Sequence, residues 1–484
     1  MGNRENQQNE ELNNFLEQLK QNDDFKSSQV NKEEASFYIG YFNSIIDKKV
    51  FQELVMSYMK QATFTDLEEL SSILPSNQIQ ITEDKKEIEQ ELLNGKIAIF
   101  MEESTECLLV ATPLNEKRQV SIPEVEFSVV GPKEAFIEDI ETNLNLIRKR
   151  IPVSHLMIKE MNVGSVTKTT VAVAYIEDFA DAENVKTVIQ RIKDIDIDQI
   201  VDSSFIQQLI SDDTNSPFPQ LLDTERPDRI ASVLTEGKVA ILVDGSPHVL
   251  IGPTTLVEFF SAFEDYFLNW IVASIFRMIR LFAVTFSILV TPFYVAILTH
   301  HFDIIPESLL ATLISSRAQV PFPPILEALI LELTIELLRE AGARLPTKVG
   351  QTIGIVGGIV IGTASVEAGL TSNVLLIIVA LGALGSFTTP VYKMSNTIRL
   401  MRFPFLLFAH VWGLVGITIC MCYVMVHLLR LTSLGRPFLE PVFPFRFKDL
   451  KDAFIRLPFR YQKKRPLEVR TNQPTRFEEE NSKR

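Results

Sequence analysis

Long uncharged, apolar runs in the second half of the chain constrain its fold more than any other feature. A helix needs about 20 apolar residues to cross a bilayer core of about 30 Å, because hydrocarbon leaves no partner for a free backbone amide. Four runs approach or reach that length: 281–299, 349–366, 368–392 and 403–429. Each is predicted to span a membrane as a helix.

Charge divides the 484-residue chain into two parts. Residues 1–270 hold 47 acidic and 24 basic residues, a net charge of −23, whereas residues 271–484 hold 14 acidic and 23 basic residues, a net charge of +9. The acidic front argues against nucleic acid as a partner, because phosphates bind to a positive face. The N-terminus has no apolar stretch typical of a signal peptide, so the front is expected to stay cytoplasmic.

Loop charges give a conflicting picture of membrane orientation. The tail 446–470 carries nine basic and three acidic residues, which favours the cytoplasmic side. Four spans would then place both ends of the chain inside. The same count places Lys393, Arg399 and Arg402 in an outer loop, which is contrary to the rule.

The second apolar run contains glycines at a spacing of four, Gly354, Gly358 and Gly362, which places them on one helix face. Such a face permits close helix packing, and in an oligomer it could instead border a pore. The bulky residues between the glycines would then constrict that pore by dewetting. These candidate constriction residues are Ile355, Val356, Ile359 and Val360.

A charged segment, PFPPILEALILELTIELLREAGARLP, lies between the first two runs and begins with prolines suited to a helix start. On a helical projection its carboxylates form a stripe opposite an apolar side, except for Glu327, which lies on the apolar side. One interpretation is an interfacial helix with its charges in water. The other is a cation pathway formed by rings of carboxylates in an oligomer. The candidate pathway residues are Glu327, Glu332, Glu336, Glu340 and Glu367.

The front of the chain contains a duplication with an offset of 142, the difference between Lys238 and Lys96. Both copies, ELLNGKIAIFMEESTECLLVATP and SVLTEGKVAILVDGSPHVLIGPT, read as a helix end, a glycine cap and two strands of a hairpin. A looser echo precedes them, in SFYIGYF and TVAVAYIED. The front is therefore predicted to be two α/β subdomains, which serve either as an assembly platform or to enclose a ligand cleft.

The predicted fold class is thus a soluble α/β region of two duplicated subdomains followed by an all-α polytopic membrane domain of about four spans plus an amphipathic helix. The predicted segments are a disordered polar arm (1–32), subdomain 1 (33–130), a connecting helix (131–151), subdomain 2 (152–265), the membrane domain (271–430) and a basic cytoplasmic tail (431–484). No nucleophile motif, metal cluster or phosphate loop is evident, so neither enzyme chemistry nor a cofactor is predicted.

The run PFPPILEALILELTIELLREAGARLPTKVGQTIGIVGGIVIGTASVEAGL, with SPFPQLLDTERPDRIASVLTEGKVAILVDGSP before it, resembles the A subunit of spore germinant receptors. The resemblance extends over about residues 36–457. It implies a multi-pass protein of the inner spore membrane with the soluble domain on the core side, which agrees with the cytoplasmic side that the basic charge predicts for the tail. It also implies a transporter-like B subunit that binds the germinant, a lipoprotein C subunit, and a homo-oligomeric ring that passes monovalent cations when germinant binds.

Two functions remain open from the sequence. The chain is either a channel-forming receptor subunit or a non-conducting scaffold that couples a germinant-binding partner to another channel.

Overall fold

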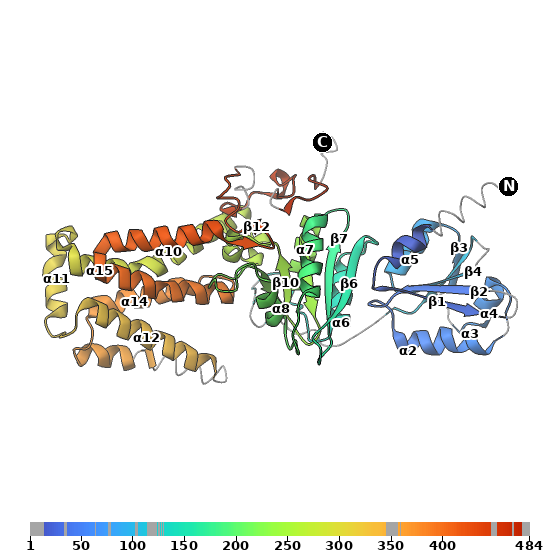
Figure 1. Ribbon diagram of the computed structural model, residues 1–484, viewed down its shortest axis with the longest axis horizontal. Helices are drawn as coiled ribbons and strands as arrows, with labels where there is room; N and C mark the ends of the chain where they lie inside the picture. The colour runs from blue at the N-terminus through green and yellow to red at the C-terminus, as the bar shows by residue number, and fades with distance from the viewer. Residues whose placement is uncertain are drawn as a thin grey trace. The chain divides into compact units, whose positions relative to one another are not determined.

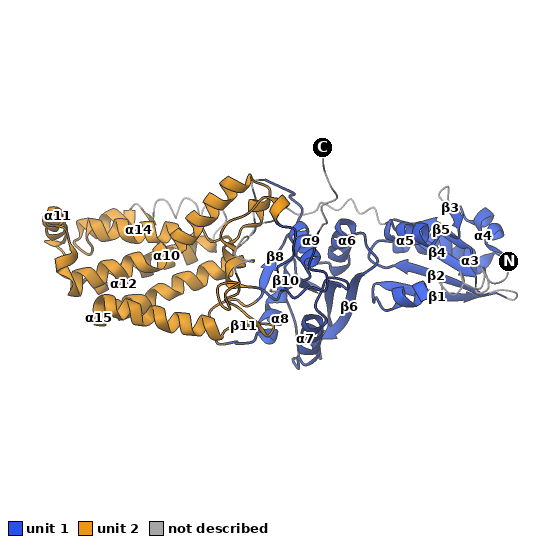
Figure 2. Ribbon diagram, turned by 90° about the horizontal axis from the view of Figure 1, so that it is seen from above, with its two compact units in different colours: residues 1–214, 221–254, 462–484 blue, residues 215–220, 255–461 orange. Residues whose placement is uncertain are grey.

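The computed structural model describes residues 14–32, 36–62, 64–75, 79–101, 105–113, 123, 126, 128, 130–344, 357–358, 360–446, 453–466 and 469–476. The chain forms two compact units. Unit 1 comprises residues 1–214, 221–254 and 462–484, and unit 2 comprises residues 215–220 and 255–461 (Figure 2).

The first subdomain of unit 1 is a five-stranded antiparallel sheet in the order β1-β2-β4-β5-β3 (Figure 1). Its strands are β1 (Phe25–Asn31), β2 (Ser36–Phe42), β3 (Ile79–Thr82), β4 (Lys96–Met101) and β5 (Cys107–Ala111). Its helices are α2 (Lys48–Val50), the π-helical η1 (Phe51–Met56), α3 (Ser57–Gln61), α4 (Leu67–Ile73) and α5 (Lys85–Leu93). Along β4, Ile97 and Ile99 enter one apolar cluster while Ala98 and Phe100 enter another, so both faces of the sheet are covered.

The second subdomain repeats this topology, with its strands in the order β6-β7-β9-β10-β8. Its strands are β6 (Leu156–Val163), β7 (Thr169–Ile176), β8 (Leu222–Thr224), β9 (Val239–Val243) and β10 (Val249–Gly252). Its helices are α7 (Ala182–Lys193), α8 (Ser203–Ile210) and α9 (Pro227–Glu236), and α6 (Ile140–Arg150) precedes β6. The predicted duplication is confirmed, since β2, β4 and β5 correspond in order and pairing to β7, β9 and β10.

The two predicted cap glycines have the expected left-handed backbone. Gly237 ends α9 with φ of 100°, and Gly95 follows α5 with φ of 86°. A Cβ at Gly237 would lie 2.6 Å from the Phe179 carbonyl oxygen, and one at Gly95 would lie 2.9 Å from that of Ile45. Both positions therefore require glycine for conformation and for space.

Aspartates cap several helices of unit 1, among them Asp139 at α6, Asp181 at α7 and Asp202 at α8. Burial raises the pKa of Asp202, but hydrogen bonds from Ser246 and Ser204 outweigh it and lower the pKa to about 2. Because the folded pKa is depressed, the stability from this cap is present above the ordinary carboxyl range and is lost only as the pH falls through about 2.

The predicted disordered arm, residues 1–32, is folded in its described part, residues 14–32, while residues 1–13 lie outside the described residues. Residues 14–20 are helical, and residues 25–31 form β1, which pairs with β2 from Phe25↔Phe42 to Asn31↔Ser36. The side chains of Phe15, Leu19 and Phe25 are buried in the first subdomain. These three apolar residues, spread through a polar stretch, supply the burial that orders it.

A buried arginine links the two subdomains. Arg148 of α6 is fully buried and pairs with Asp24 at 2.8 Å, and its guanidinium lies 4.2 Å from the centroid of the Phe42 ring. Asp24 also accepts hydrogen bonds from the backbone and hydroxyl of Ser44, at 2.9 and 2.8 Å. Desolvation lowers the pKa of Arg148, and Asp24 opposes that change. The predicted connecting helix therefore also forms part of the core.

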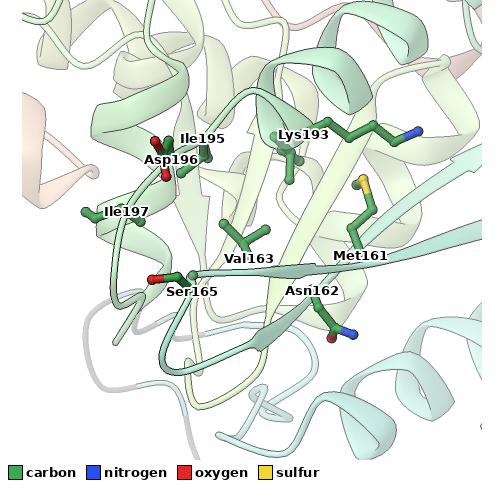
Figure 3. Close-up of a pocket in the computed structure, with 10 residues that line it drawn as sticks. Met161, Asn162, Val163, Ser165, Lys193, Ile195, Asp196 and Ile197 are labelled. Carbon is green, nitrogen blue, oxygen red and sulfur yellow. The ribbon is translucent and has the colours of Figure 1, made fainter.

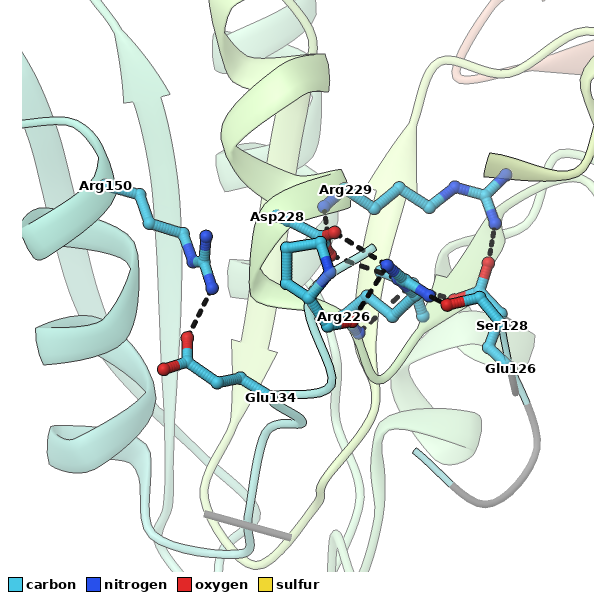
Figure 4. A network of polar contacts seen from close by, with 9 residues as sticks. Glu126, Ser128, Glu134, Arg150, Arg226, Asp228 and Arg229 are labelled. Carbon is cyan, nitrogen blue, oxygen red and sulfur yellow. Dashed lines mark hydrogen bonds and ion pairs between the residues drawn. The ribbon is translucent and has the colours of Figure 1, made fainter. Parts of the chain in front are cut away.

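A second polar network attaches the segment before α6 to the start of α9 (Figure 4). Arg226 is buried, donates to Asp228 at 2.7 Å and to the Pro132 carbonyl at 3.2 Å, and also contacts the Ser128 hydroxyl. The next arginine, Arg229, pairs with Glu126. The arginines of the motif TERPDR thus hold the linker between the subdomains against the start of α9.

The end of the chain returns to unit 1 as a segment that we term the C-terminal strap, residues 462–476. Arg465 lies 3.9 Å from the centroid of the Phe179 ring and donates to the Thr235 carbonyl at 2.7 Å. Arg476 pairs with Glu236 at 2.8 Å. The strap therefore contacts the end of α9 through hydrogen bonds and an ion pair. Residues 431–461 of the predicted tail belong to unit 2 instead.

Unit 2 is mainly helical. Its main helices are α10 (Trp270–His300), α11 (Glu307–Arg317), α12 (Pro324–Ala343), α14 (Asn373–Ser386) and α15 (Tyr392–Arg430). Its short elements are η2 (Leu256–Phe260), η3 (Phe263–Tyr266), η4 (Phe302–Ile304), β11 (Thr432–Ser433), β12 (Arg436–Pro437) and η5 (Phe459–Tyr461). By length and hydropathy α10 and α15 could cross a membrane, and α14 is a shorter apolar helix. The count of four spans stays a prediction.

Helix α15 reverses direction at Gly413, where the backbone is non-helical with φ of 60° and ψ of −137°. Thr397 near its start donates to the Pro217 carbonyl at 2.5 Å, and His427 near its end contacts the Ser216 hydroxyl at 2.8 Å. Two residues 30 positions apart in one straight helix would be about 45 Å apart and could not both reach this dipeptide. The predicted single span 403–429 is therefore wrong, because its residues belong to two antiparallel halves.

Two histidines at the end of α10 provide hydrogen-bond partners for backbone groups at this reversal. His300 Nε2 lies 2.8 Å from the His410 carbonyl, and the Leu414 amide donates to His301 Nε2 at 3.3 Å. A Cβ on Gly413 would lie 2.7 Å from His301 Nε2. The turn thus combines a glycine-only conformation with partners for the backbone groups that the helix leaves free.

Candidate functional site: the charged core of the helical unit

The predicted charged helix is present as α12. Glu327 is the first carboxylate on this helix and lies in its first turn. The Glu327 side chain is fully buried and pairs with Arg317 of α11 at 2.7 Å. Its other oxygen accepts from the Ser372 amide at 3.2 Å, just before α14. Glu327 therefore connects α12 to two other segments of unit 2.

Glu332 contacts two other helices of unit 2. Its Oε2 accepts from Arg402 of α15 at 3.0 Å, and its Oε1 accepts from the Thr291 hydroxyl of α10 at 2.9 Å. Arg402 also donates to the Ser287 hydroxyl at 2.5 Å and to the Gly382 carbonyl at 2.8 Å. The side chains of Glu332 and Arg402 are 2% and 1% exposed, so the pair is shielded from solvent.

The remaining candidate carboxylates are more accessible within one copy of the chain. Glu336 is 29% exposed and lies 3.2 Å from Arg399 Nε. Glu340 is 64% exposed and pairs with Arg344, four residues later on the same helix. Glu367 is exposed at the end of the glycine-containing helix. The structure thus separates the five predicted pathway residues into two buried and three accessible carboxylates.

The outward side of α12 is apolar, which differs from the predicted arrangement. Leu326, Ile330, Leu333 and Leu337 are 44%, 38%, 52% and 70% exposed, whereas Glu332 is buried. An interfacial helix with its carboxylates in water therefore does not describe Glu332. The physical reason is that arginines of other helices neutralise the inward carboxylates, which a projection of α12 alone cannot show.

The same pairs reduce the orientation conflict raised by the loop charges, leaving Lys393 as its remaining residue. Arg399 and Arg402 are buried in the helical unit and contact Glu336 and Glu332. Basic residues count toward orientation when they lie in loops near the ends of spans. These two arginines therefore carry no information about which side of the membrane their segment faces.

The candidate constriction is described only in part. Gly354, Ile355, Val356 and Ile359 lie outside the described residues. Val360 is 56% exposed, and a Cβ added to Gly358 would meet none of the described residues within 4 Å. A Cβ on Gly362 would instead lie 3.6 Å from Leu376 of α14. Gly362 thus packs against α14, whereas Gly358 has no such contact among the described residues.

A cavity of about 630 Å³ lies between α11 and the turn that precedes α14. Its polar lining consists of uncharged hydroxyl and amide groups: Thr312, Ser315, Ser316, Gln319, Thr371 and Asn373. The Thr371 side chain is 2% exposed, and its hydroxyl has no hydrogen-bond partner among the described residues. The cavity therefore offers oxygen groups without charge.

In unit 1, a cavity of about 480 Å³ lies within the second subdomain, where β6 and α7 end (Figure 3). Lys193 extends away from Asp196 and Ser165, so the polar groups that line the cavity do not converge on one point (Figure 3). No group of three or more metal-ligating side chains is present in the part of the chain that the structure describes. This cavity gives no support to the ligand-cleft alternative over the platform.

The partners Arg317, Arg399 and Arg402 were not predicted from the sequence. One signal was available, because an arginine beside an apolar run is costly in lipid unless a carboxylate reaches it. Arg402 immediately precedes the run 403–429 and is therefore expected to pair with a carboxylate. The choice among the carboxylates required the tertiary structure.

Comparison with known proteins places the whole chain among related sequences. The family described as Bacillus/Clostridium GerA spore germination protein matches residues 13–468. Spore germination protein GerQA of Bacillus cereus is 50% identical over 97% of this chain and 94% of its own length. Spore germination protein A1 of Bacillus subtilis is 40% identical over 95% of each chain. The crystal structure of the N-terminal domain of the A subunit of the Bacillus megaterium spore germinant receptor GerK3 has a TM-score of 0.36 and 28% identity, covering 50% of this chain and 92% of that one.

Proposed function

Because this chain belongs to the GerA family of spore germination proteins, we propose that it is the membrane subunit of a germinant receptor that oligomerises and passes monovalent cations when germinant is sensed. The observation that carries this proposal is the family match across residues 13–468, which includes both the soluble unit and the apolar helices. The expected location is the inner membrane of the spore. The soluble unit and the C-terminal strap are expected on the core side.

The proposed partners are a transporter-like B subunit that binds the germinant, a lipoprotein C subunit and further copies of this chain. The duplicated subdomains of unit 1 are proposed to be the platform for assembly. The alternative is a non-conducting scaffold that couples a germinant-binding partner to a separate channel.

Purified protein in liposomes distinguishes these functions. A channel subunit is expected to release trapped potassium, alone or with its partner subunits, and to appear as a closed ring with an axial opening in images of the detergent-solubilised particle. Assembly without potassium release would support the scaffold. A chain that remains a single copy in a bilayer would contradict both.

The accessible carboxylates Glu336, Glu340 and Glu367 are proposed to attract cations to the pathway. They are supported by their exposure within one copy, which leaves them able to face a neighbouring copy or water. Glu327 and Glu332 are also paired with arginines, but at 0% and 2% exposure they cannot face water or a neighbouring copy.

Replacing Glu336 with glutamine is expected to lower cation flux. A unit charge about 5 Å from a cation in water contributes about 0.8 kcal/mol, which corresponds to roughly a fourfold change in local cation concentration. Flux through liposomes measured at low salt should fall by roughly that factor. Glu307→Gln on α11 is the matched control and should leave flux unchanged, whereas equal flux in both variants would remove Glu336 from the pathway.

Replacing Val360 with alanine is expected to make the pore leak without germinant. A smaller apolar side chain widens a hydrophobic constriction and lets it hydrate. Basal potassium release should rise at least severalfold while particle size is unchanged. A tight, fully inducible response in this variant would argue against Val360 as the constriction.

A further inference from the structure

Arg402 joins four helices through one guanidinium. It lies on α15, and its donors reach Glu332 on α12, the Ser287 hydroxyl on α10 and the Gly382 carbonyl on α14. The planar fork of arginine suits several acceptors fixed in one plane, whereas the lysine ammonium is a compact point charge on a flexible stem. The identity of the residue at this position therefore matters as well as its charge.

We propose that Arg402 and Glu332 are a positioning pair, which fixes the register of α12 against α10, α14 and α15 and withdraws Glu332 from the cation pathway. This goes beyond the proposed conduction, since it assigns the pair to the arrangement of the helices. In a helix each residue advances the chain by 1.5 Å and turns it by about 100°. A slip of α12 by one residue would therefore carry Glu332 away from both Arg402 and Thr291.

Partners on both sides of the carboxylate support this assignment. Glu332 uses one oxygen for Arg402 and the other for the Thr291 hydroxyl, and it is only 2% exposed, so within one copy it is shielded from a passing cation. A buried ion pair is costly to break from one side, because the remaining charge stays in an apolar environment without a partner. Removing both charges together avoids that cost, which makes a double-mutant cycle the appropriate test.

The first experiment compares Glu332→Met, Arg402→Met and the double variant in the full chain. The fraction of detergent-solubilised protein that elutes as the wild-type particle is measured. Each single change is expected to lower this fraction at least tenfold, and the double variant is expected to recover to within about threefold of wild type. Arg344→Gln breaks the exposed pair with Glu340 on the same helix and should leave the fraction unchanged.

The second experiment measures register directly. Cysteines at Leu331 of α12 and Val379 of α14, which share one apolar cluster, are cross-linked after the native cysteines are replaced with serine. Arg402→Lys keeps the charge but not the fork. It is expected to assemble and yet to lower the cross-linking yield at least threefold. A purely neutralising role would leave that yield unchanged and would overturn the positioning assignment.

The outcomes separate this inference from the proposed function. Single variants that assemble like wild type, or a double variant that fails as badly as the singles, would contradict the pair. If the assembled double variant loses cation flux that wild type shows, Glu332 belongs to the pathway and the inference is overturned. If wild type passes no cations, the proposed conduction fails, while assembly and cross-linking still decide the role of the pair.

Discussion

Replacing Gly416 with alanine is expected to destabilise the helical unit strongly. A Cβ at this position would fall on the carbonyl oxygen of Phe408, which lies beside Gly416 because α15 reverses at Gly413. That oxygen belongs to the backbone and cannot rotate away. Overpacking of a close contact costs about 1–3 kcal/mol or more, and a rigid backbone places this site at the upper end. Two orders of magnitude in the folded population are therefore at stake.

The measurement is the yield of monodisperse full-length protein after solubilisation of membranes. Gly342→Ala is the matched control, because a Cβ there meets nothing within 4 Å in the part of the chain that the structure describes and alanine favours a helix. This control should retain or slightly increase the yield. Normal yield from Gly416→Ala would mean that the two halves of α15 do not lie together, and a single continuous helix would have to replace the reversal.

Replacing Arg148 with methionine is expected to destabilise unit 1 by about 3–5 kcal/mol, because the buried Asp24 carboxylate loses its counter-ion. Both side chains are almost fully buried, at 0% and 1% exposure. Asp24 would keep only its hydrogen bonds from Ser44. Hydrogen exchange of β1 and β6 in the full chain, followed through urea unfolding, reports this loss where the two subdomains meet.

Arg150→Met provides the control for Arg148. Arg150 lies two residues later on α6 and forms a pair with Glu134, in which the two side chains are 25% and 48% exposed. Exposed pairs contribute about 0–1 kcal/mol, so this variant should unfold nearly as wild type does. Similar losses in both variants would show that α6 is sensitive to any substitution and that the buried pair has no special role.

Much of unit 1 could be predicted from the sequence, because its strands follow a local rule. Alternating side chains in KIAIFM and KVAILV and the glycines that precede them define a strand and a cap without tertiary information. The repeat then fixes the order of the second sheet from the first. The N-terminal arm was missed because only Phe15, Leu19 and Phe25 order it, and no periodic pattern connects them.

The helical unit was harder to predict, because hydropathy records apolar length and not direction. The uncharged run 403–429 contains no proline or charge at its turn, and Gly413 resembles the packing glycines elsewhere in the chain. Its reversal depends on contacts from His300 and His301, more than 100 residues earlier. The ion pairs of the candidate site also could not be predicted from local sequence, because the partners of Glu327 and Glu332 lie on other helices, α11 and α15.

The C-terminal strap has a consequence for the number of membrane passes. The polypeptide leaves unit 1 after Thr254 and rejoins it at Gln462, where Arg465 and Arg476 hold it to α9. A chain that starts and finishes on one folded body cannot finish on the opposite side of a bilayer. We therefore propose that residues 255–461 make an even number of membrane passes, and we expect reporters fused to the two termini to be digested, or protected, together.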